Sequence, residues 1–321
     1  MEIENPFRWS KSRAATFGEC KRRYYLRYYA HWGGWKESAP ERTRLAYRLG
    51  KMTTMPALVG TAVHEVLARH FQAVRNGQFR ELNPERPVEL MRQAWSDARK
   101  EMWKVNPKTY PPLFELYYRN VPPGEKLKEY AELARRAIRA VRESTLYRTI
   151  LARDKEDYLW IDPAAEKFSE ETYFDIPPFQ AIASPDLVFR GEGRVAVLDW
   201  KTGRRSDNDA VQMAAAGVWA RRRLQLPGSD LVGILVYLAL GETAEIALDQ
   251  SSAARAEETI RGGMEGMAAY LKDRERNIPL DEEAFPRHHN EGFCRRCEFQ
   301  QICFGPKAET YNGPELSLQE V

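Results

Sequence analysis

Apolar residues change their spacing along the chain, and the change predicts helices in the first half and strands in the second. In the first half they recur every three or four positions, which is the spacing of one buried helix face. Beyond Tyr158 they form short β-prone runs separated by proline or glycine, as strands do. The helices are expected over residues 12–29, 59–74, 88–103 and 125–151.

The second half is expected to alternate strands with helices. Three short strands, over residues 172–176, 180–189 and 194–200, follow one another as in an antiparallel meander. They precede a helix from Asp207 to Arg223, a buried strand over residues 231–239, its hairpin partner over 243–248 and a last helix over 252–276. This order predicts an α/β fold, with a central mixed β-sheet flanked by helices and a helical insertion near residues 80–155.

Length and composition are those of a soluble globular protein. The chain has 321 residues, 43% of them hydrophobic and 30% charged, which suits two units or one large core with insertions. Its longest apolar stretch, residues 231–241, is shorter than the ~18 residues that a membrane-spanning helix needs. The first residues, MEIENPFRW, are acidic where a signal peptide is basic. We therefore expect a cytoplasmic protein with no membrane partner.

A basic and aromatic segment lies near the N-terminus, although the whole chain has a net charge of only +3. Between Arg8 and Arg48, eleven basic residues stand against three acidic ones. The aromatic residues interleaved with them are Trp9, Phe17, Tyr24, Tyr25, Tyr28, Tyr29, Trp32 and Trp35. Cations neutralise phosphates and aromatic rings stack on unpaired bases, so the segment suits single-stranded nucleic acid. An ordinary amphipathic helix with its tyrosines packed inward explains the pattern equally well.

Two carboxylates and a lysine are expected to meet at the end of the predicted sheet. Asp199 and Lys201 are two positions apart on one strand, so both side chains lie on the same face. Asp186 ends the preceding strand or its turn, and pairing of the two strands brings it close to them. Such oxygen ligands hold Mg²⁺ or Mn²⁺, and a neighbouring lysine orients water and offsets charge on a phosphate. Taken alone, D-x-K is also typical of a solvated strand end.

Four motifs, in the right order, resemble the PD-(D/E)XK nuclease superfamily in its RecB-like branch. That branch carries G-x-x-x-H-E on a helix, G-x-x-D and D/E-x-K-T-G on strands, and Q-x-x-x-Y on a further helix. In this chain the first motif is Gly60 to Glu65 and the second ends at Asp186. The third is Asp199 to Gly203, and the fourth begins at Gln212.

The resemblance departs from the family pattern at two places, where Ala183 replaces the glycine of the second motif and Ala216 replaces the tyrosine of the fourth. Neither change removes a metal ligand. The resemblance implies a restriction-endonuclease-like core. The metal ligands that it implies are His64, Asp186, Asp199 and the carbonyl oxygen of Trp200. It also implies that Lys201 positions the attacking water and that Gln212 supports the site.

The chain has four cysteines, three of which form a C-x2-C-x5-C pattern near the C-terminus. They are Cys20, Cys294, Cys297 and Cys303. A reducing cytoplasm disfavours disulfides, so metal coordination suits these thiols better. The residues alone leave open a zinc site that includes His288 or His289, an iron–sulfur cluster, and free thiols.

The spacing of one distant and three local cysteines resembles the iron–sulfur nucleases of the RecB-like branch. These include the CRISPR-associated adaptation exonucleases and the AddB subunit of bacterial helicase-nucleases. The resemblance implies a [4Fe-4S] cluster on the four cysteines. Such a cluster would close a very long loop and hold the basic segment beside the core. We expect it to be a structural module that joins the N- and C-terminal segments, and not a carrier of electrons.

These observations divide the chain into three regions. Residues 1–57 are expected to form a basic, aromatic helical segment that contributes one cluster cysteine. Residues 58–280 are expected to form the nuclease core with its insertion at about 80–155. Residues 281–321 are expected to form the C-terminal iron–sulfur segment and tail.

The leading hypothesis is a metal-dependent DNA nuclease, using Mg²⁺ or Mn²⁺, that acts on single strands or DNA ends. The resemblance favours an exonuclease of 5′ to 3′ polarity that leaves a 5′-phosphate and a 3′-hydroxyl. The alternative is a catalytically silent, nucleic-acid-binding scaffold in a larger complex. An iron–sulfur redox protein is a third hypothesis, which leaves the Asp and Lys motifs unexplained. The chain has no G-x-x-x-x-G-K-[ST] phosphate loop, so a helicase, like an integrase, would have to be a protein partner.

Overall fold

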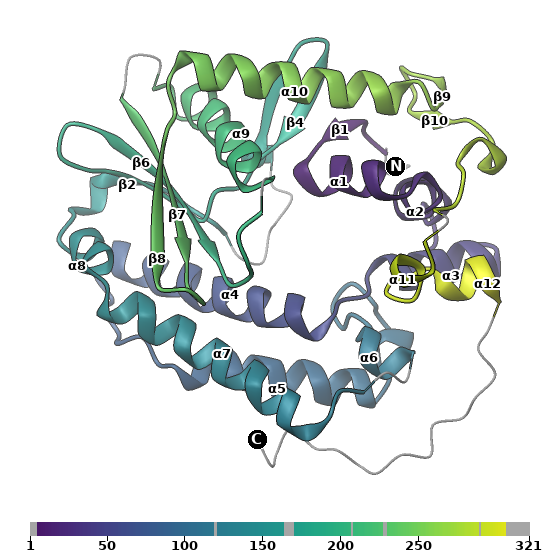
Figure 1. The fold of residues 1–321 in the computed structure, drawn as a ribbon, viewed down its shortest axis with the longest axis horizontal. Coiled ribbons are helices and arrows are strands. Elements are labelled where there is room, and N and C mark those ends of the chain that lie inside the picture. The colour runs from purple at the N-terminus through teal and green to yellow at the C-terminus, as the bar shows by residue number, and fades with distance from the viewer. Residues whose placement is uncertain are drawn as a thin grey trace.

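The structure is a computed structural model that describes residues 5–118, 121–163, 170–206, 208–226, 230–288 and 290–305. Its centre is a five-stranded sheet with helices on both faces (Figure 1). The strand order is β2 (Tyr158–Ile161), β5 (Leu187–Arg190), β6 (Val195–Lys201), β7 (Leu231–Tyr237) and β8 (Glu242–Ala247). The β6 and β7 pair is parallel and the other neighbouring pairs are antiparallel. The expected α/β fold with a mixed sheet is confirmed.

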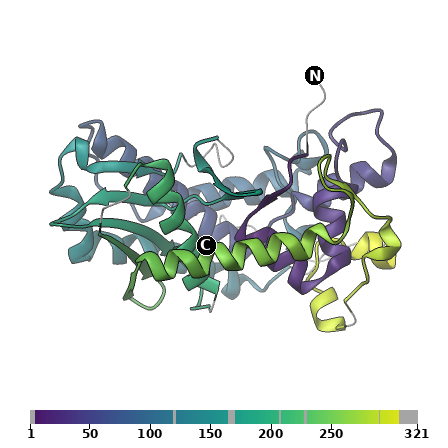
Figure 2. The same ribbon diagram turned by 90° about the horizontal axis from the view of Figure 1, so that it is seen from above.

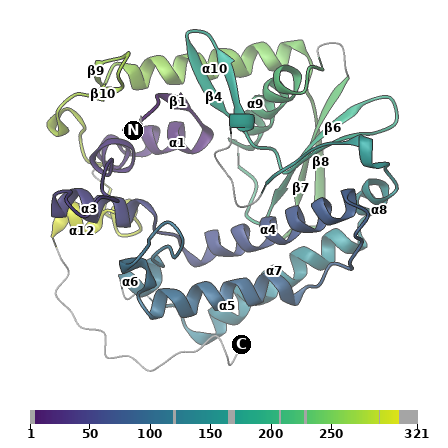
Figure 3. The same ribbon diagram turned by 180° about the vertical axis from the view of Figure 1, so that it is seen from behind.

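Two helical layers cover the sheet. On one face lies α4 (Met55–Arg75), which α5 (Glu85–Arg99) and α7 (Gly124–Glu143) cover in turn (Figure 3). On the other face lie α9 (Asn208–Arg223) and α10 (Gln250–Ala268). The helices α5 and α7 thus form an outer layer over α4, and the interpretation of residues 80–155 as an insertion stays a prediction. None of the helices in the described ranges has both the length and the apolar character needed to cross a membrane.

Side chains of β6 alternate between the two helical layers. Leu198 and Trp200 belong to the hydrophobic cluster around α4, and Trp200 stacks on Phe71 with ring centroids 6.1 Å apart. Val197 belongs to the cluster around α9 and α10. Because the side-chain period of a strand is two, Asp199 continues the face that α9 covers.

A second, smaller sheet ties the N-terminus to the middle of the chain. It consists of β1 (Arg8–Trp9), β4 (Phe179–Ile182) and β3 (Tyr173–Ile176). After β1 follow α1 (Lys11–Glu19) and α2 (Lys21–Tyr25), and α1 packs against α9 and α10. This places the N-terminal segment beside the main sheet (Figure 1).

The C-terminal segment returns to the N-terminal one. Its helices α11 (Glu291–Cys294) and α12 (Gln300–Phe304) lie beside α2 and α3 (Glu41–Gly50) (Figure 2). Phe299 is fully buried there, in a small cluster with Leu26 and Leu49. Further short elements include a π-helical turn at Leu26–Ala30, α6 (Phe114–Tyr117), α8 (Thr145–Leu151), β9 (Leu271–Asp273) and β10 (Ile278–Pro279).

Two expected helices are interrupted. The helix expected over residues 12–29 begins at the cap Ser10 and breaks at Cys20, whose backbone is extended (φ −157°, ψ 117°) and whose sulfur caps α2. The helix expected over residues 125–151 breaks at Ser144, whose hydroxyl caps α8. Polar caps within an apolar pattern therefore divide what periodicity alone joins. Asp207, expected to begin the helix that is α9, lies outside the described residues.

The expected three-stranded meander is wrong. The segment expected as one strand over residues 180–189 is two strands in different sheets, β4 with β3 and β5 with β6. Pro185 separates them, and because proline has no backbone N–H it cannot continue a strand ladder. The edge strand β2 was not expected. By contrast, the hairpin of β7 and β8 is confirmed.

Candidate active site

Strand pairing brings Asp186 and Asp199 to one end of the sheet. Leu187 of β5 pairs with Leu198 of β6, and the Asp186 N–H donates to the Leu198 carbonyl at 3.1 Å. Asp186 and Asp199 are 8% and 5% exposed, so neither carboxyl group is left to bulk water. Two buried carboxylates this close need a cation or a proton between them.

Asp186 is held from both sides. Its Oδ2 accepts a hydrogen bond from the Trp200 N–H at 2.6 Å, and its Oδ1 lies 2.7 Å from His64 Nδ1. His64 reaches it from α4, which approaches the strand ends closely at Gly60. A Cβ at Gly60 would lie 3.1 Å from Thr202 Oγ1, so a side chain there would require Thr202 to shift by a few tenths of an ångström.

Lys201, Asp199 and Gln212 form one connected group. Lys201 Nζ lies 2.5 Å from Asp199 Oδ2 and donates to Gln212 Oε1 at 2.7 Å. Gln212 Nε2 in turn donates to Asp199 Oδ1 at 2.9 Å. Gln212 comes from α9, the helix that covers this face of β6. The structure thus brings together all the residues that the motifs pointed to, from α4, β5, β6 and α9.

Two further residues join this group that the sequence reasoning missed. Lys11, at the start of α1, donates to Gln212 Oε1 at 2.7 Å and to Asp209 Oδ1 at 3.3 Å. Asp209 is 4% exposed and also accepts from the Ser206 N–H at 3.0 Å and the Tyr237 hydroxyl at 3.2 Å. The signal for Asp209 was its position one helical turn before Gln212. The sequence gives no comparable signal for Lys11, because its contacts span about two hundred residues.

The electrostatics of the group show an excess of negative charge. Burial, followed by the charge of Asp186, raises the pKa of Asp199 to about 6, although Lys201 opposes the rise. Burial acts to lower the pKa of His64, but the contact with Asp186 outweighs it and the pKa is raised. Burial also lowers the pKa of Lys11, as does the charge of Lys201. Three carboxylates face two ammonium groups and the imidazole of His64 here, so the group favours a further cation when His64 is neutral.

The donor set fits Mg²⁺ or Mn²⁺. Buried carboxylate oxygens are the ligands that these ions prefer, and the carboxylate of Asp199 lies here with Oδ2 2.5 Å from Lys201 Nζ. No three or more His, Cys, Asp and Glu side chains within the described ranges are grouped to hold a metal ion as they stand. An ion would have to replace contacts that His64, Asp186 and Asp199 now make within the group.

The two departures from the family pattern lie beside the site and not within it. The Ala183 N–H donates to the Thr172 carbonyl at 3.1 Å, which fixes the backbone between β4 and β5. Ala216 is 5% exposed and lies in the hydrophobic cluster of α9. Neither position supplies a side chain to the connected polar group.

The cysteines lie at the junction of the N- and C-terminal segments, but the structure does not arrange them as a metal site. None of the four forms a disulfide. Burial raises the pKa of Cys303. No metal-holding group is found among the described cysteines and histidines. The expected iron–sulfur module is therefore not shown, and His289 lies outside the described residues.

Ion pairs hold this junction together. Glu298 is 6% exposed and accepts from Arg23 Nε at 3.0 Å and from an Arg27 amino group at 2.6 Å. Glu282 binds Arg22 of α2 and accepts from Arg42 of α3 at 2.7 Å. The joining of the two ends is thus carried by carboxylate and guanidinium groups.

Most aromatic side chains of the basic segment pack inward. Tyr24 is fully buried, and Trp9 and Tyr29 are 3% and 7% exposed, all within the cluster around α9 and α10. Buried Arg13 lies among these rings, 4.7 Å from the centroid of Tyr28. The amphipathic-helix interpretation therefore holds for this part of the segment, and these rings form no surface for stacked bases.

A model described as "PD-(D/E)XK nuclease superfamily" matches residues 8–304, which is nearly the whole chain and includes every residue of the polar group described above. No curated protein matches the chain.

Proposed function

Because the chain belongs to the PD-(D/E)XK nuclease superfamily, we propose that it is a metal-dependent DNA nuclease with its catalytic centre at the end of β6. The observation that carries the proposal is the connected group of Asp199, Lys201 and Gln212, next to which the Trp200 N–H and His64 of α4 hold Asp186. Burying Lys201 and Asp199 together costs desolvation energy, which a lysine and an aspartate without a function would avoid by staying at the surface.

The residues divide the work of phosphodiester hydrolysis. Asp199 and Gln212 fix Lys201 Nζ, which can orient the attacking water and stabilise charge that develops on the phosphate. Asp186, fixed by the Trp200 N–H, keeps its carboxylate at the same point. Water would attack phosphorus and the bond between phosphorus and the 3′-oxygen would break, which leaves a 3′-hydroxyl on one product and a 5′-phosphate on the other.

Asp186, Asp199, His64 and the Trp200 carbonyl would hold the divalent ion. When bound, Mg²⁺ or Mn²⁺ supplies polarisation of the phosphate oxygens and lowers the pKa of a coordinated water. Asp209 and Lys11 do not belong to this ligand set. Lys11 contacts Gln212 and Asp209, and Asp209 lies near Lys201, so their opposite charges offset each other behind the ligand set.

The proposed substrate is single-stranded DNA or a DNA end, cut as an exonuclease with 5′ to 3′ polarity. Support for a nucleic acid comes from superfamily membership. Support for single strands and polarity comes from the resemblance to the RecB-like branch. A helicase or integrase partner would supply such ends.

We also propose a [4Fe-4S] cluster on Cys20, Cys294, Cys297 and Cys303. The support is the resemblance in cysteine spacing, together with the absence of a disulfide at any of the four cysteines. Four cysteines are the usual ligand set of this cluster. The test is to measure iron and sulfide in anaerobically purified protein. Protein that contains no iron and still unfolds in one cooperative thermal transition would contradict the proposal.

The test of nuclease function uses strands labelled at either end, with Mn²⁺, Mg²⁺ or EDTA. Wild-type protein is expected to release labelled mononucleotides or short products only with a divalent ion. Asp199→Asn is expected to be inactive and to melt like the wild type. Blocking the 5′ end should protect the strand, and blocking the 3′ end should not. Cleavage by Asp199→Asn at the wild-type rate would refute the assignment.

A further inference from the structure

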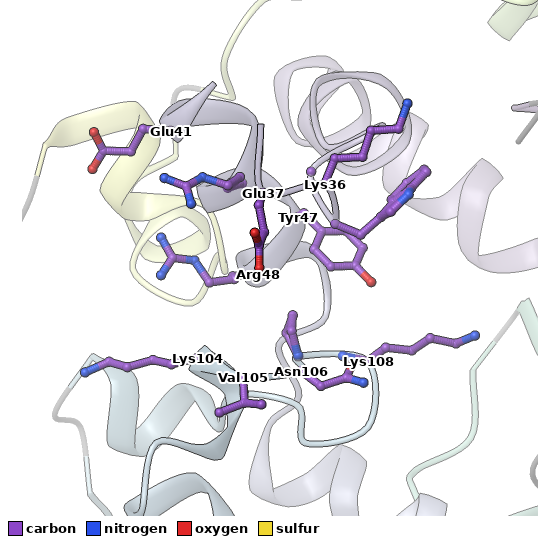
Figure 4. Close-up of a pocket in the computed structure, with 13 residues that line it drawn as sticks. Lys36, Glu37, Glu41, Tyr47, Arg48, Lys104, Val105, Asn106 and Lys108 are labelled. Carbon is purple, nitrogen blue, oxygen red and sulfur yellow. Dashed lines mark hydrogen bonds between the residues drawn. The ribbon is translucent and has the colours of Figure 1, made fainter. Parts of the chain in front are cut away.

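A basic cavity lies outside the catalytic centre. It is bounded by α3 with its preceding loop on one side and by the turn of residues 104–108 on the other, and its volume is about 880 Å³. Figure 4 shows side chains of these two walls on opposite sides of a gap. The cations that line it are Lys36, Arg44, Arg48, Lys104 and Lys108, and the acids that line it are Glu37 and Glu41.

Most of these cations have no acidic partner. Lys104 pairs with Glu101. The cavity cations that form no ion pair within the described part of the chain are Lys36, Arg44, Arg48 and Lys108. The Arg48 Nε is buried and makes no hydrogen bond. Like charges gathered without partners repel one another, so an anion among them lowers their energy. The cavity therefore suits a ligand that carries several negative charges.

An aromatic ring stands at the same cavity. Trp35 is 37% exposed, in contrast to the buried rings of the segment before it. Its indole is held edge-on by Trp32 and Tyr47, at centroid distances of 5.1 and 5.8 Å. Gly34 permits this arrangement, because a Cβ there would lie 2.5 Å from the Tyr47 Cβ. Trp35 thus offers a fixed ring beside unpaired cations.

The two walls belong to one frame. Between them, the Thr53 N–H donates to the Pro112 carbonyl at 3.0 Å, and the Phe114 N–H donates to the Thr53 carbonyl at 2.8 Å. After Thr53 the chain enters α4, along which Met55 and His64 are about 14 Å apart at the usual helical rise. The cavity therefore adjoins the segment that leads into α4, whereas His64 lies further along that helix.

We propose that this cavity binds single-stranded DNA, with phosphates on Arg44, Arg48, Lys36 and Lys108 and with an unpaired base stacked on Trp35. Cations along a groove and a ring on which a base stacks are the two elements of single-strand binding. A duplex has no free base face for Trp35. The proposal deepens the proposed nuclease function, on which it rests for the identity of the strand, by placing a second grip on the substrate away from the cut.

The test measures binding and not cleavage. Fluorescein-labelled oligo(dT) of twenty nucleotides is titrated with full-length protein in EDTA, by fluorescence anisotropy at several salt concentrations. The variant Arg44→Ala/Lys108→Ala is expected to bind roughly tenfold more weakly than wild type, with a salt slope smaller by about 1.4. The matched control is Lys128→Ala/Arg136→Ala, which removes two exposed cations from α7. Binding by the cavity variant equal to that of this control would overturn the proposal.

Trp35→Ala separates stacking from charge. It is expected to weaken oligo(dT) binding roughly tenfold and to leave binding of inorganic polyphosphate unchanged. Equal loss for both ligands would overturn the stacking role, and tighter binding of oligo(U) than of oligo(dT) would overturn the assignment to DNA. The melting temperature shows that each variant is folded. Binding is measured in EDTA, so it does not depend on cleavage. A wild-type protein that binds DNA through the cavity in EDTA but does not cut with Mn²⁺ or Mg²⁺ would refute the nuclease proposal and leave the binding site standing.

Discussion

The proposed catalytic centre and the cysteine junction both join residues far apart in the sequence, but different forces hold them. At the proposed catalytic centre the polar groups of the motifs themselves make the contacts, as in the group of Asp199, Lys201 and Gln212. At the junction the contacts are made by Glu298 and Glu282, and the Cys297 thiol lies beside Glu298. The first region is built around its chemistry. In the second region, ion pairs hold the N- and C-terminal segments together whether or not the cysteines bind a metal.

The largest effect is expected from Lys201→Ala. Loss of the amine that Asp199 and Gln212 position should lower the cleavage rate about a thousandfold. The fold should persist, since Asp199 can take up a proton when its partner is lost. Single-turnover cleavage and a melting curve measure both, with Lys272→Ala as an exposed control. A rate within tenfold of wild type would show that the group is structural.

Glu298→Gln should act on stability and not on catalysis. The buried carboxylate pairs with Arg23 and Arg27, and leaving these guanidinium groups without it should cost about 3 kcal/mol of unfolding free energy. Urea denaturation measures the loss, and the control is Glu258→Gln, at an exposed position of α10. Equal stability of the two variants would mean that the junction does not depend on this ion pair. A changed cleavage rate in the folded protein would mean that the two regions are coupled.

Lys11→Met should show how far α1 takes part in catalysis. Its amine shares Gln212 Oε1 with Lys201, so its loss should lower kcat about tenfold by letting Gln212 shift, with little change in KM. Steady-state kinetics on short single strands provide the measurement. A rise in KM alone would assign Lys11 to substrate binding instead.

Glu282→Gln should give the smallest effect, one that depends on pH. Hydrogen bonds from Arg42 hold the pKa of Glu282 below its ordinary value of 4.5, against the effect of burial. Its stabilisation is therefore present above pH 4.5 and is lost as the pH falls through the lowered value. The variant should melt about 2 °C below wild type at pH 7, and the gap should close at acid pH. A gap that is constant with pH would exclude this ion pair as its cause.

Strand register made the polar group at the end of β6 predictable from the sequence. The two-residue spacing of Asp199 and Lys201 places them on one face, and a motif order led to His64 and Gln212. Lys11 was not predictable, because its place depends on how α1 packs against α9. The split of the expected meander follows from Pro185, a local signal that was in the sequence.

The cysteine junction shows where such reasoning ends. The spacing of the thiols says which residues can share a ligand, but the packing of α2 on α12 decides how close they come. The same holds for the basic segment, where amphipathic packing took Tyr24 and Tyr29 inward and left Trp35 outside. Composition shows which aromatic and basic residues the segment contains, and tertiary packing decides which of them lie at the surface.

The central claim is that the buried group at the end of β6 is a divalent metal site that serves cleavage. Calorimetric titration of Mn²⁺ into wild type, Asp199→Asn and Lys201→Ala tests it without relying on activity. Wild type and Lys201→Ala should bind the ion, and Asp199→Asn should lose that binding. Mn²⁺ binding by Asp199→Asn with wild-type affinity would contradict the account.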